Sequence, residues 1–523
     1  CWWILRDLFD RGFLYEAYRT TMHCPRCNTS LASHEVSLGM RDEVDDPSVW
    51  PKFRVINFEN ESGSVSLLAW TTTPWTLPAN VALCVKPGAT YVLVEGPARH
   101  GVPEGPRELF ILAEALVDAT FAEGTATVLK TIAAEELVGL RYEPLFESYV
   151  RPKTSLDKAY RVIADDFVSL EDGTGIVHIA PAYGDLEYGQ RYDLPTVFSV
   201  DLTGTMYPQV RLIAPIDEEL DFKDLFFKDA DPVITRALTR SGSMFRSGRV
   251  VHAYAFCWRD DTPLLFYAKD SWYIRTTLIK DKLLSNNAKI NWVPENVGTG
   301  RFGKWLENNI DWSLSRERYW GCPLPIWENR DGGRIERICV GSVEELGQLA
   351  GLDLSDLDLH RPYVDKITFE RDGKTFKRVP YTIDCWFESG AMPYAQWHYP
   401  FENQKEFLEN FPADFICEAV DQTRGWFYTL HAIATLLTDA GGDDRRAGPL
   451  AEHFPESSAF KNGVVLGLLP DKYGKKMSKS KGNVVDPWSV LDNQGADALR
   501  WYLYSSGPPD QTKAFDVDKV TET

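Results

Sequence analysis

A short basic segment near the end of the chain places the strongest limit on its fold. It reads Lys475-Lys476-Met477-Ser478-Lys479-Ser480-Lys481-Gly482-Asn483 and follows the apolar run 463–469, which predicts a buried strand. A polar loop beyond a strand is typical of an open α/β sheet, because such sheets bind ligands outside the carboxyl ends of their strands. Two lysines, Lys476 and Lys479, can reach one polyanion there. Judged by charge alone, however, the segment is better explained as a solvated charge run, or as a nuclear-localisation or nucleic-acid patch, than as a ligand-binding loop.

Composition limits the class of protein. A length of 523 residues predicts two to four domains, and 44% hydrophobic with 25% charged residues is typical of a soluble globular protein. No apolar stretch is long enough for a membrane helix and no signal peptide is visible, so we expect no membrane partner. Nine cysteines without a regular framework favour the reducing cytoplasm. With a net charge of −20, any RNA contact is expected on a local basic patch or on parts outside this chain.

The pattern along the chain predicts an α/β protein that carries a β-rich insertion. Residues 1–44 indicate a helix that runs into a Cys-x-x-Cys knuckle, and 45–245 hold short β-branched runs separated by Gly and Pro, which favour a barrel-like domain. In 246–505, strand-like runs alternate with helical ones. Residues 506–523 are expected to begin a helical region. Because the first residues lie inside an amphipathic pattern and the last lack a terminal element, we expect a fragment cut at both ends.

The order Lys-Met-Ser-Lys-Ser at 476–480 resembles the signature loop of class I aminoacyl-tRNA synthetases, which closes on the phosphates of ATP. The segments 70–78, 314–321 and 421–427 resemble the isoleucine-specific members, and the likeness covers essentially the whole chain. It implies an incomplete Rossmann-like catalytic domain with an inserted editing domain. The implied activity is ATP-dependent activation of L-isoleucine, with Mg²⁺, and its transfer to tRNA(Ile) by a cytoplasmic monomer. The family's His-x-Gly-His motif does not occur in these residues, so we expect them to hold half of the ATP site.

A strand-to-helix corner is expected to carry part of the synthetic site. The strand predicted at 414–420 ends near Glu418, and a helix follows Asp421 and Gln422, so their side chains can accept hydrogen bonds from ribose hydroxyls or an ammonium group. By itself, Asp421 is equally well explained as a helix N-cap. The resemblance implies that Glu418 and Asp421 contact the adenylate and that Gln422 lies beside the amino acid. It also implies an apolar pocket walled by Trp386 and Trp426, which alone would be read as core residues, and catalytic roles for Lys476, Ser478 and Lys479.

The predicted insertion has its own cluster of polar side chains. Three consecutive hydroxyls, Thr71, Thr72 and Thr73, cannot all face one side of a strand, and prolines 74 and 78 indicate an irregular loop. His178 follows a strand-like run, where a structural role is the commoner one. The resemblance implies a hydrolytic editing site that clears Val-tRNA(Ile), with Glu187 as the acid that binds the ammonium group. The family usually has Asp at that position.

Four further residues suggest a metal site. Cys24 and Cys27 have the spacing of a structural zinc half-site, and Cys257 with Asp260 can supply the other half. Related enzymes often present a second Cys where Asp260 stands, so zinc is a possible cofactor rather than an expected one.

Two functions from other classes stay open. The chain can be a free-standing editing deacylase, against which the retained α/β half with Lys476 and Lys479 argues. It can also be a non-catalytic relic that binds tRNA, in which the lysine loop and the threonine cluster are expected to decay. Both motifs are intact.

Overall fold

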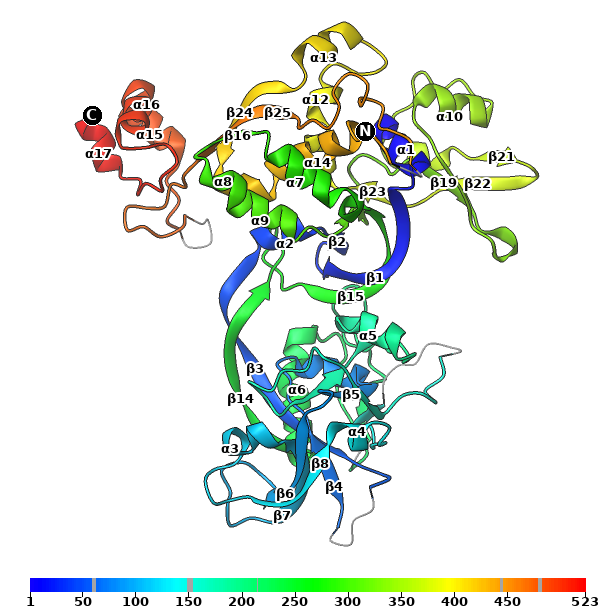
Figure 1. Cartoon of the computed structure of the whole chain (residues 1–523), viewed down its shortest axis with the longest axis vertical. Coiled ribbons are helices and arrows are strands. Elements are labelled where there is room, and N and C mark those ends of the chain that lie inside the picture. The colour runs from blue at the N-terminus through cyan, green and yellow to red at the C-terminus, as the bar shows by residue number, and fades with distance from the viewer. Residues whose placement is uncertain (59–62, 148–153, 214, 443–444, 478–481) are drawn as a thin grey trace. The chain divides into compact units, whose positions relative to one another are not determined.

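The computed structural model describes residues 1–58, 63–147, 154–213, 215–442, 445–477 and 482–523, and they form two compact units (Figure 1). Unit 1 comprises Cys1–Glu16, Ala32–Leu38 and Trp272–Thr523, and unit 2 comprises Ala17–Leu31 and Gly39–Ser271. The chain therefore leaves unit 1 and returns to it twice. Unit 2 reaches further at both ends than the predicted insertion 45–245.

Unit 1 contains a parallel sheet in the order β16 (Asn291–Val293), β25 (Phe460–Leu466) and β24 (Ala413–Ala419). Parallel neighbours need a crossover, and helix α14 (Trp426–Leu437) lies in the segment that connects β24 to β25. Phe427 to Leu437 are all buried, so this helix forms part of the core. The arrangement confirms the predicted α/β class and the predicted strand and helix around residues 414–437.

Helices and short antiparallel strands complete unit 1. Its apolar core includes Trp292, Trp312 and Phe427. The other elements are α1 (Trp2–Asp10), α2 (Ser33–Leu38), α7 (Lys280–Asn287), α8 (Asn296–Thr299), α9 (Arg301–Glu307), β17 (Trp312–Ser313), β18 (Ser315–Arg316), β19 (Ile326–Asn329), β20 (Glu336–Cys339), α10 (Val343–Ala350), β21 (Phe369–Arg371), β22 (Lys374–Arg378), β23 (Thr382–Ile383), α11 (Cys385–Gly390), α12 (Met392–Ala395), α13 (Gln404–Asn410), α15 (Pro487–Asn493), α16 (Ala496–Ser505) and α17 (Val517–Glu522).

Unit 2 is built on a six-stranded sheet in the order β14-β3-β4-β7-β6-β8. Its longest ladder pairs β3 (Met40–Arg54) with β14 (Met244–Ala255), and Figure 1 shows these two strands as a long curved ribbon. This ladder explains why unit 2 extends beyond 45–245, because its hydrogen bonds continue to Met40 and Ala255. The β-rich character is as predicted, but the sheets in the described residues have open edges and none closes into a barrel.

The remaining elements of unit 2 are short, and its core includes Phe53, Tyr91 and Phe198. They are β2 (Thr29–Leu31), β4 (Val65–Leu68), η1 (Pro74–Ala79), β5 (Ala82–Val85), β6 (Thr90–Pro97), β7 (Arg107–Ala113), α3 (Val117–Thr120), β8 (Thr127–Ala133), α4 (Ala134–Leu137), β9 (Phe146–Glu147), β10 (Arg161–Ala164), β11 (Ile176–Ile179), η3 (Pro181–Tyr183), α5 (Leu186–Arg191), β12 (Arg211–Leu212), β13 (Glu218–Glu219) and α6 (Phe227–Ser241). Two of the four boundaries between the units fall within β1 (Leu14–Cys24) and β15 (Leu265–Ile274), and the other two follow Leu31 and Leu38. Among all described residues, no helix has the length and apolar character needed to span a bilayer.

Candidate synthetic and editing sites

The strand-to-helix corner forms where the sequence places it. β24 ends at Ala419, the short helix η7 spans Val420–Arg424, and α14 begins at Trp426. Gln422 Oε1 accepts a hydrogen bond from the Trp426 amide at 3.0 Å, and Gln422 Nε2 donates to Asp421 Oδ2 at 3.3 Å. Gln422, rather than Asp421, therefore satisfies the first turn of α14. Asp421 is half-buried and Glu418 is exposed at the carboxyl end of β24, so both carboxylates can reach a ligand.

The two predicted pocket tryptophans lie beside this corner. A Cβ added to Gly425 would lie 3.3 Å from the Trp386 ring and 2.7 Å from Gln422 Oε1, so the backbone here is in close contact with both side chains. Trp426 Nε1 donates to the Ser389 carbonyl of α11 at 3.1 Å. The structure thus brings Trp386, Gln422 and Trp426 to one corner of unit 1.

Only the two flanks of the lysine loop can be placed, because Ser478 and Lys479 lie outside the described residues. Lys475 and Lys476 are exposed. Asp471, which follows β25, accepts hydrogen bonds from the Lys475 amide and from Asn483 Nδ2, both at 2.8 Å. The Asn483 hydrogen bond, together with the backbone amides, lowers the pKa of Asp471. Residues on either side of the loop are therefore held by a single carboxylate.

In unit 2, a chain of hydroxyl groups leads to the predicted histidine. Thr71 Oγ1 lies 3.2 Å from Thr73 Oγ1, which lies 3.1 Å from Thr76 Oγ1, and that atom is 3.0 Å from His178 Nε2. Burial lowers the pKa of His178 to about 4, so the imidazole is neutral near pH 7. The sequence predicted an irregular loop at Pro74 and Pro78, but both prolines lie in η1, a 3-10 helix that follows Thr73. No hydrogen bond joins Thr72 to this chain of hydroxyls within the described residues.

Glu187 takes a different position from the threonines. It lies in the first turn of α5, its side chain is 76% exposed, and it accepts a hydrogen bond from Arg191 at 2.8 Å. In the described part of the chain, no hydrogen bond connects it with the threonines or with His178. A ligand ammonium at this carboxylate has to compete with the Arg191 guanidinium.

Two residues at or near the hydroxyl chain of unit 2 were not identified from the sequence. Thr76 joins Thr73 to His178, and Asp231 of α6 accepts a hydrogen bond from the Trp75 amide at 2.8 Å. Burial raises the pKa of Asp231 to about 7. The sequence could have indicated Asp231, because it is an acidic residue within the apolar pattern of 227–238 and a buried carboxylate needs a hydrogen-bond donor.

A buried ionic cluster lies next to Trp386. Arg316 Nη2 contacts Glu35 Oε2 at 2.5 Å and Asp384 Oδ2 at 3.0 Å, while His34 Nε2 lies 3.1 Å from the same Asp384 oxygen. His34 also contacts the edge of the Trp386 ring, at 5.8 Å between centroids. Burial opposes ionisation of Asp384, but the Arg316 charge and His34 outweigh it and hold the pKa of that carboxyl well below its usual range. The Arg316 guanidinium lies between the two acids and offsets one of their two negative charges.

The four predicted metal ligands converge in unit 2. Their ligand atoms all lie within 4.8 Å of one another. Cys27 Sγ is 3.1 Å from Asp260 Oδ2, Cys24 Sγ is 3.7 Å from both Asp260 oxygens, and the Cys27 amide donates to Cys24 Sγ at 3.3 Å. Tetrahedral zinc with Zn–S bonds of about 2.3 Å needs ligand separations of roughly 3.7 Å. The donor set therefore fits a structural zinc ion.

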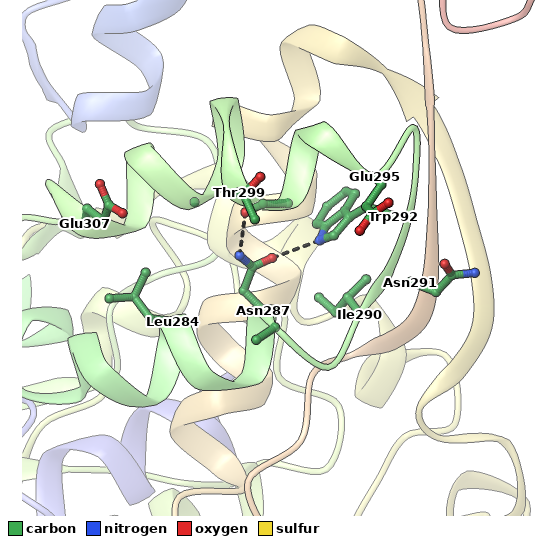
Figure 2. A pocket seen from close by; sticks show the side chains of 11 residues that line it. Leu284, Asn287, Ile290, Asn291, Trp292, Glu295, Thr299 and Glu307 are labelled. Atoms are coloured by element: carbon green, nitrogen blue, oxygen red, sulfur yellow. Dashed lines mark hydrogen bonds between the residues drawn. The ribbon is translucent and has the colours of Figure 1, made fainter.

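A pocket of about 650 Å³ opens between α7, β16, α8 and α9 (Figure 2). Asn287 spans it: its amide donates to the Gly298 carbonyl at 2.8 Å, and its oxygen accepts from Trp292 Nε1 at 2.8 Å. The described lining contains Glu295 and Glu307 but no basic side chain, and none of the predicted site residues. It is therefore unsuited to a phosphate group.

A family model described as tRNA synthetases class I (I, L, M and V) matches residues 1–515. The chain belongs to this family. It is 47% identical to the isoleucine–tRNA ligase of Clostridium novyi over 527 aligned residues, which cover 100% of the chain and 46% of that protein. The isoleucine–tRNA ligase of Thermus thermophilus is 46% identical, again over 100% of the chain and 46% of the relative.

The chain thus spans about half the length of the curated relatives it matches. Among solved structures, the ternary complex of Agrobacterium radiobacter K84 agnB2 LeuRS with tRNA and LeuAMS aligns with 100% of this chain and 59% of that one. Its TM-score is 0.37 and its identity is 14%, a likeness too weak to assign residues. For a class I tRNA synthetase, the parallel sheet of unit 1 and the strand-to-helix corner are the expected frame of a nucleotide site.

Proposed function

We propose that this chain is the part of an isoleucine–tRNA ligase that carries the amino-acid pocket, the lysine loop and the editing domain. The whole protein would activate L-isoleucine with ATP and Mg²⁺, transfer it to tRNA(Ile), act as a monomer, and hydrolyse Val-tRNA(Ile). The observation that carries the proposal is 47% identity to a relative of that name over the entire chain.

The corner in unit 1 supports the synthetic half of the proposal. Trp386 and Trp426 provide apolar surface for an aliphatic side chain, and Gln422 has its amide beside them. The carboxylates of Glu418 and Asp421 can accept from ribose hydroxyls or hold an ammonium group. A pocket of this kind excludes valine poorly, because valine is smaller by only one methylene. A second, hydrolytic site is then needed for fidelity.

The hydroxyl chain in unit 2 supports the editing half. Thr71, Thr73 and Thr76 present hydroxyls in sequence, and His178 stays neutral, so the cluster can hold an ester end and a water by hydrogen bonds. With a pKa of about 4, His178 is a weak base, and we infer that positioning supplies much of the rate. Glu187 is proposed to hold the ammonium group of the misactivated valine.

Deacylation of Val-tRNA(Ile) by this chain tests the proposal. We expect slow hydrolysis of Val-tRNA(Ile) with Ile-tRNA(Ile) spared. Glu187→Ala should reduce the rate by at least about 100-fold, the scale of losing one electrostatic contact, whereas Glu187→Asp should preserve or improve it. The measurement is release of labelled amino acid from each charged tRNA.

The matched control is Glu171→Ala, which removes another exposed carboxylate of unit 2 and should leave the rate unchanged. Equal deacylation of both charged tRNAs, or full activity in Glu187→Ala, contradicts the editing proposal.

We also propose that Cys24, Cys27, Cys257 and Asp260 hold a structural zinc ion. Bound there, zinc would tie β1 to the turn after β14 by four ligands. Purified protein should contain close to one zinc per chain, and Cys24→Ser should lose it, whereas Cys84→Ser, at a buried cysteine outside the cluster, should retain it. Elemental analysis of undenatured protein decides the point, and a zinc-free wild type refutes it.

A further inference from the structure

Two arginines of unit 1 meet at the carboxyl edge of the parallel sheet. Arg301, the first residue of α9, donates from Nε to Thr423 Oγ1 at 2.9 Å. One turn further along α9, the ring of Trp305 lies 5.4 Å from the guanidinium carbon of Arg424. Arg301 and Trp305 share one side of the helix, because residues four apart are neighbours on its surface. Both guanidiniums therefore lie where η7 packs against α9.

These charges lack a carboxylate partner in the described part of the chain. No ion pair within 4.0 Å involves Arg301 or Arg424 among those residues, although acidic side chains outnumber basic ones by 76 to 56. Arg424 Nε is buried and has no hydrogen-bond partner there. Partial burial and then the Arg424 charge lower the pKa of Arg301, and Asp421 offsets only part of this. Two adjacent cations at such a position are costly unless an anion joins them.

We propose that Arg301 and Arg424 together bind a phosphate group. The inference rests on the proposed function, because it gives the synthetic site of unit 1 a second anion contact, separate from the lysine loop. Guanidinium groups bind phosphate through two parallel N–H donors, and the bond to Thr423 fixes the plane of Arg301 while leaving its Nη groups for the ligand. Arg424 lies three residues after Asp421, on the same η7 segment as the predicted contacts Asp421 and Gln422, and Arg301 reaches that segment through Thr423. The phosphate belongs either to the nucleotide or to the RNA acceptor end.

Direct binding separates the two sources. This chain would be titrated with inorganic pyrophosphate and, separately, with a single-stranded RNA ending in CCA. For Arg301→Gln and Arg424→Gln, we expect about tenfold weaker binding of one probe in each single variant. For the RNA probe, the slope of log K against log salt should become shallower by about 1 for each arginine removed. A loss confined to pyrophosphate indicates the nucleotide, and a loss confined to RNA indicates the acceptor end.

Arg371→Gln is the matched control, because it removes an exposed arginine from the β21–β22 turn of the same unit and should change neither affinity. Arg301→Lys keeps the charge without the planar fork and should fall between Arg301→Gln and the wild type. Melting temperatures show whether each variant is folded. The proposal is overturned if the wild type binds neither probe, or if the folded double variant binds both within twofold of the wild type. The proposed synthetic function is tested separately, by pyrophosphate exchange in the full-length protein, so its failure can be distinguished from a failure of phosphate binding.

Discussion

Replacing Asp384 by alanine is expected to lower the free energy of unfolding by about 3–5 kcal/mol, because it leaves a buried guanidinium without half of its charge partners. Asp384 is fully buried and receives Arg316, His34 and the Trp312 indole, and its other oxygen accepts from the Trp386 amide at 3.2 Å. Its loss should also loosen Trp386, which we propose to line the amino-acid pocket. Urea unfolding followed by tryptophan fluorescence measures the effect.

Asp414→Ala provides the control, since this carboxylate is 89% exposed and pairs with Lys461 on the surface at 2.9 Å. It should change the unfolding free energy by less than about 1 kcal/mol. Asp384→Asn, which keeps the shape and loses the charge, should be intermediate. Equal small effects from Asp384→Ala and Asp414→Ala would show that the cluster does not stabilise unit 1.

Replacing Lys479 by alanine in the full-length protein is expected to slow isoleucyl-adenylate formation by about 10²–10³, the scale of removing one electrostatic contact to the reacting group. The expectation comes from the order of residues in the loop, because Lys479 lies outside the described residues. Isoleucine affinity should change much less. Pyrophosphate exchange measures the first quantity and equilibrium binding the second.

Lys475→Ala is the control within the same segment, at an exposed residue whose backbone is held by Asp471. It should leave the exchange rate within a few-fold of wild type. If Lys479→Ala does the same, the lysine has no part in the reaction.

Local patterns predicted much of the frame around the candidate sites. The runs at 414–420 and 463–469 correspond to β24 and β25, shifted by one to three residues, and the apolar face after Asp421 became α14. The Cys-x-x-Cys spacing predicted that Cys24 and Cys27 act together, and the structure brings Cys257 and Asp260 to them as predicted. Short apolar runs bounded by Gly and Pro determine strands and turns through contacts close in sequence, so such elements can be read without the fold.

The residues by themselves determined the α/β class of unit 1, the β-rich character of unit 2 and the positions of the chemical motifs. Only the tertiary structure decided which side chains meet: that Thr76 links Thr73 to His178, that Glu187 is engaged by Arg191, and that Arg316 lies between Glu35 and Asp384. Arg316 is separated from Glu35 by 281 positions. Contacts of that range depend on how whole elements pack. A buried charge or donor without a partner is costly, so such groups are paired in the folded protein, but the periodicity of the local sequence does not show which residues become partners.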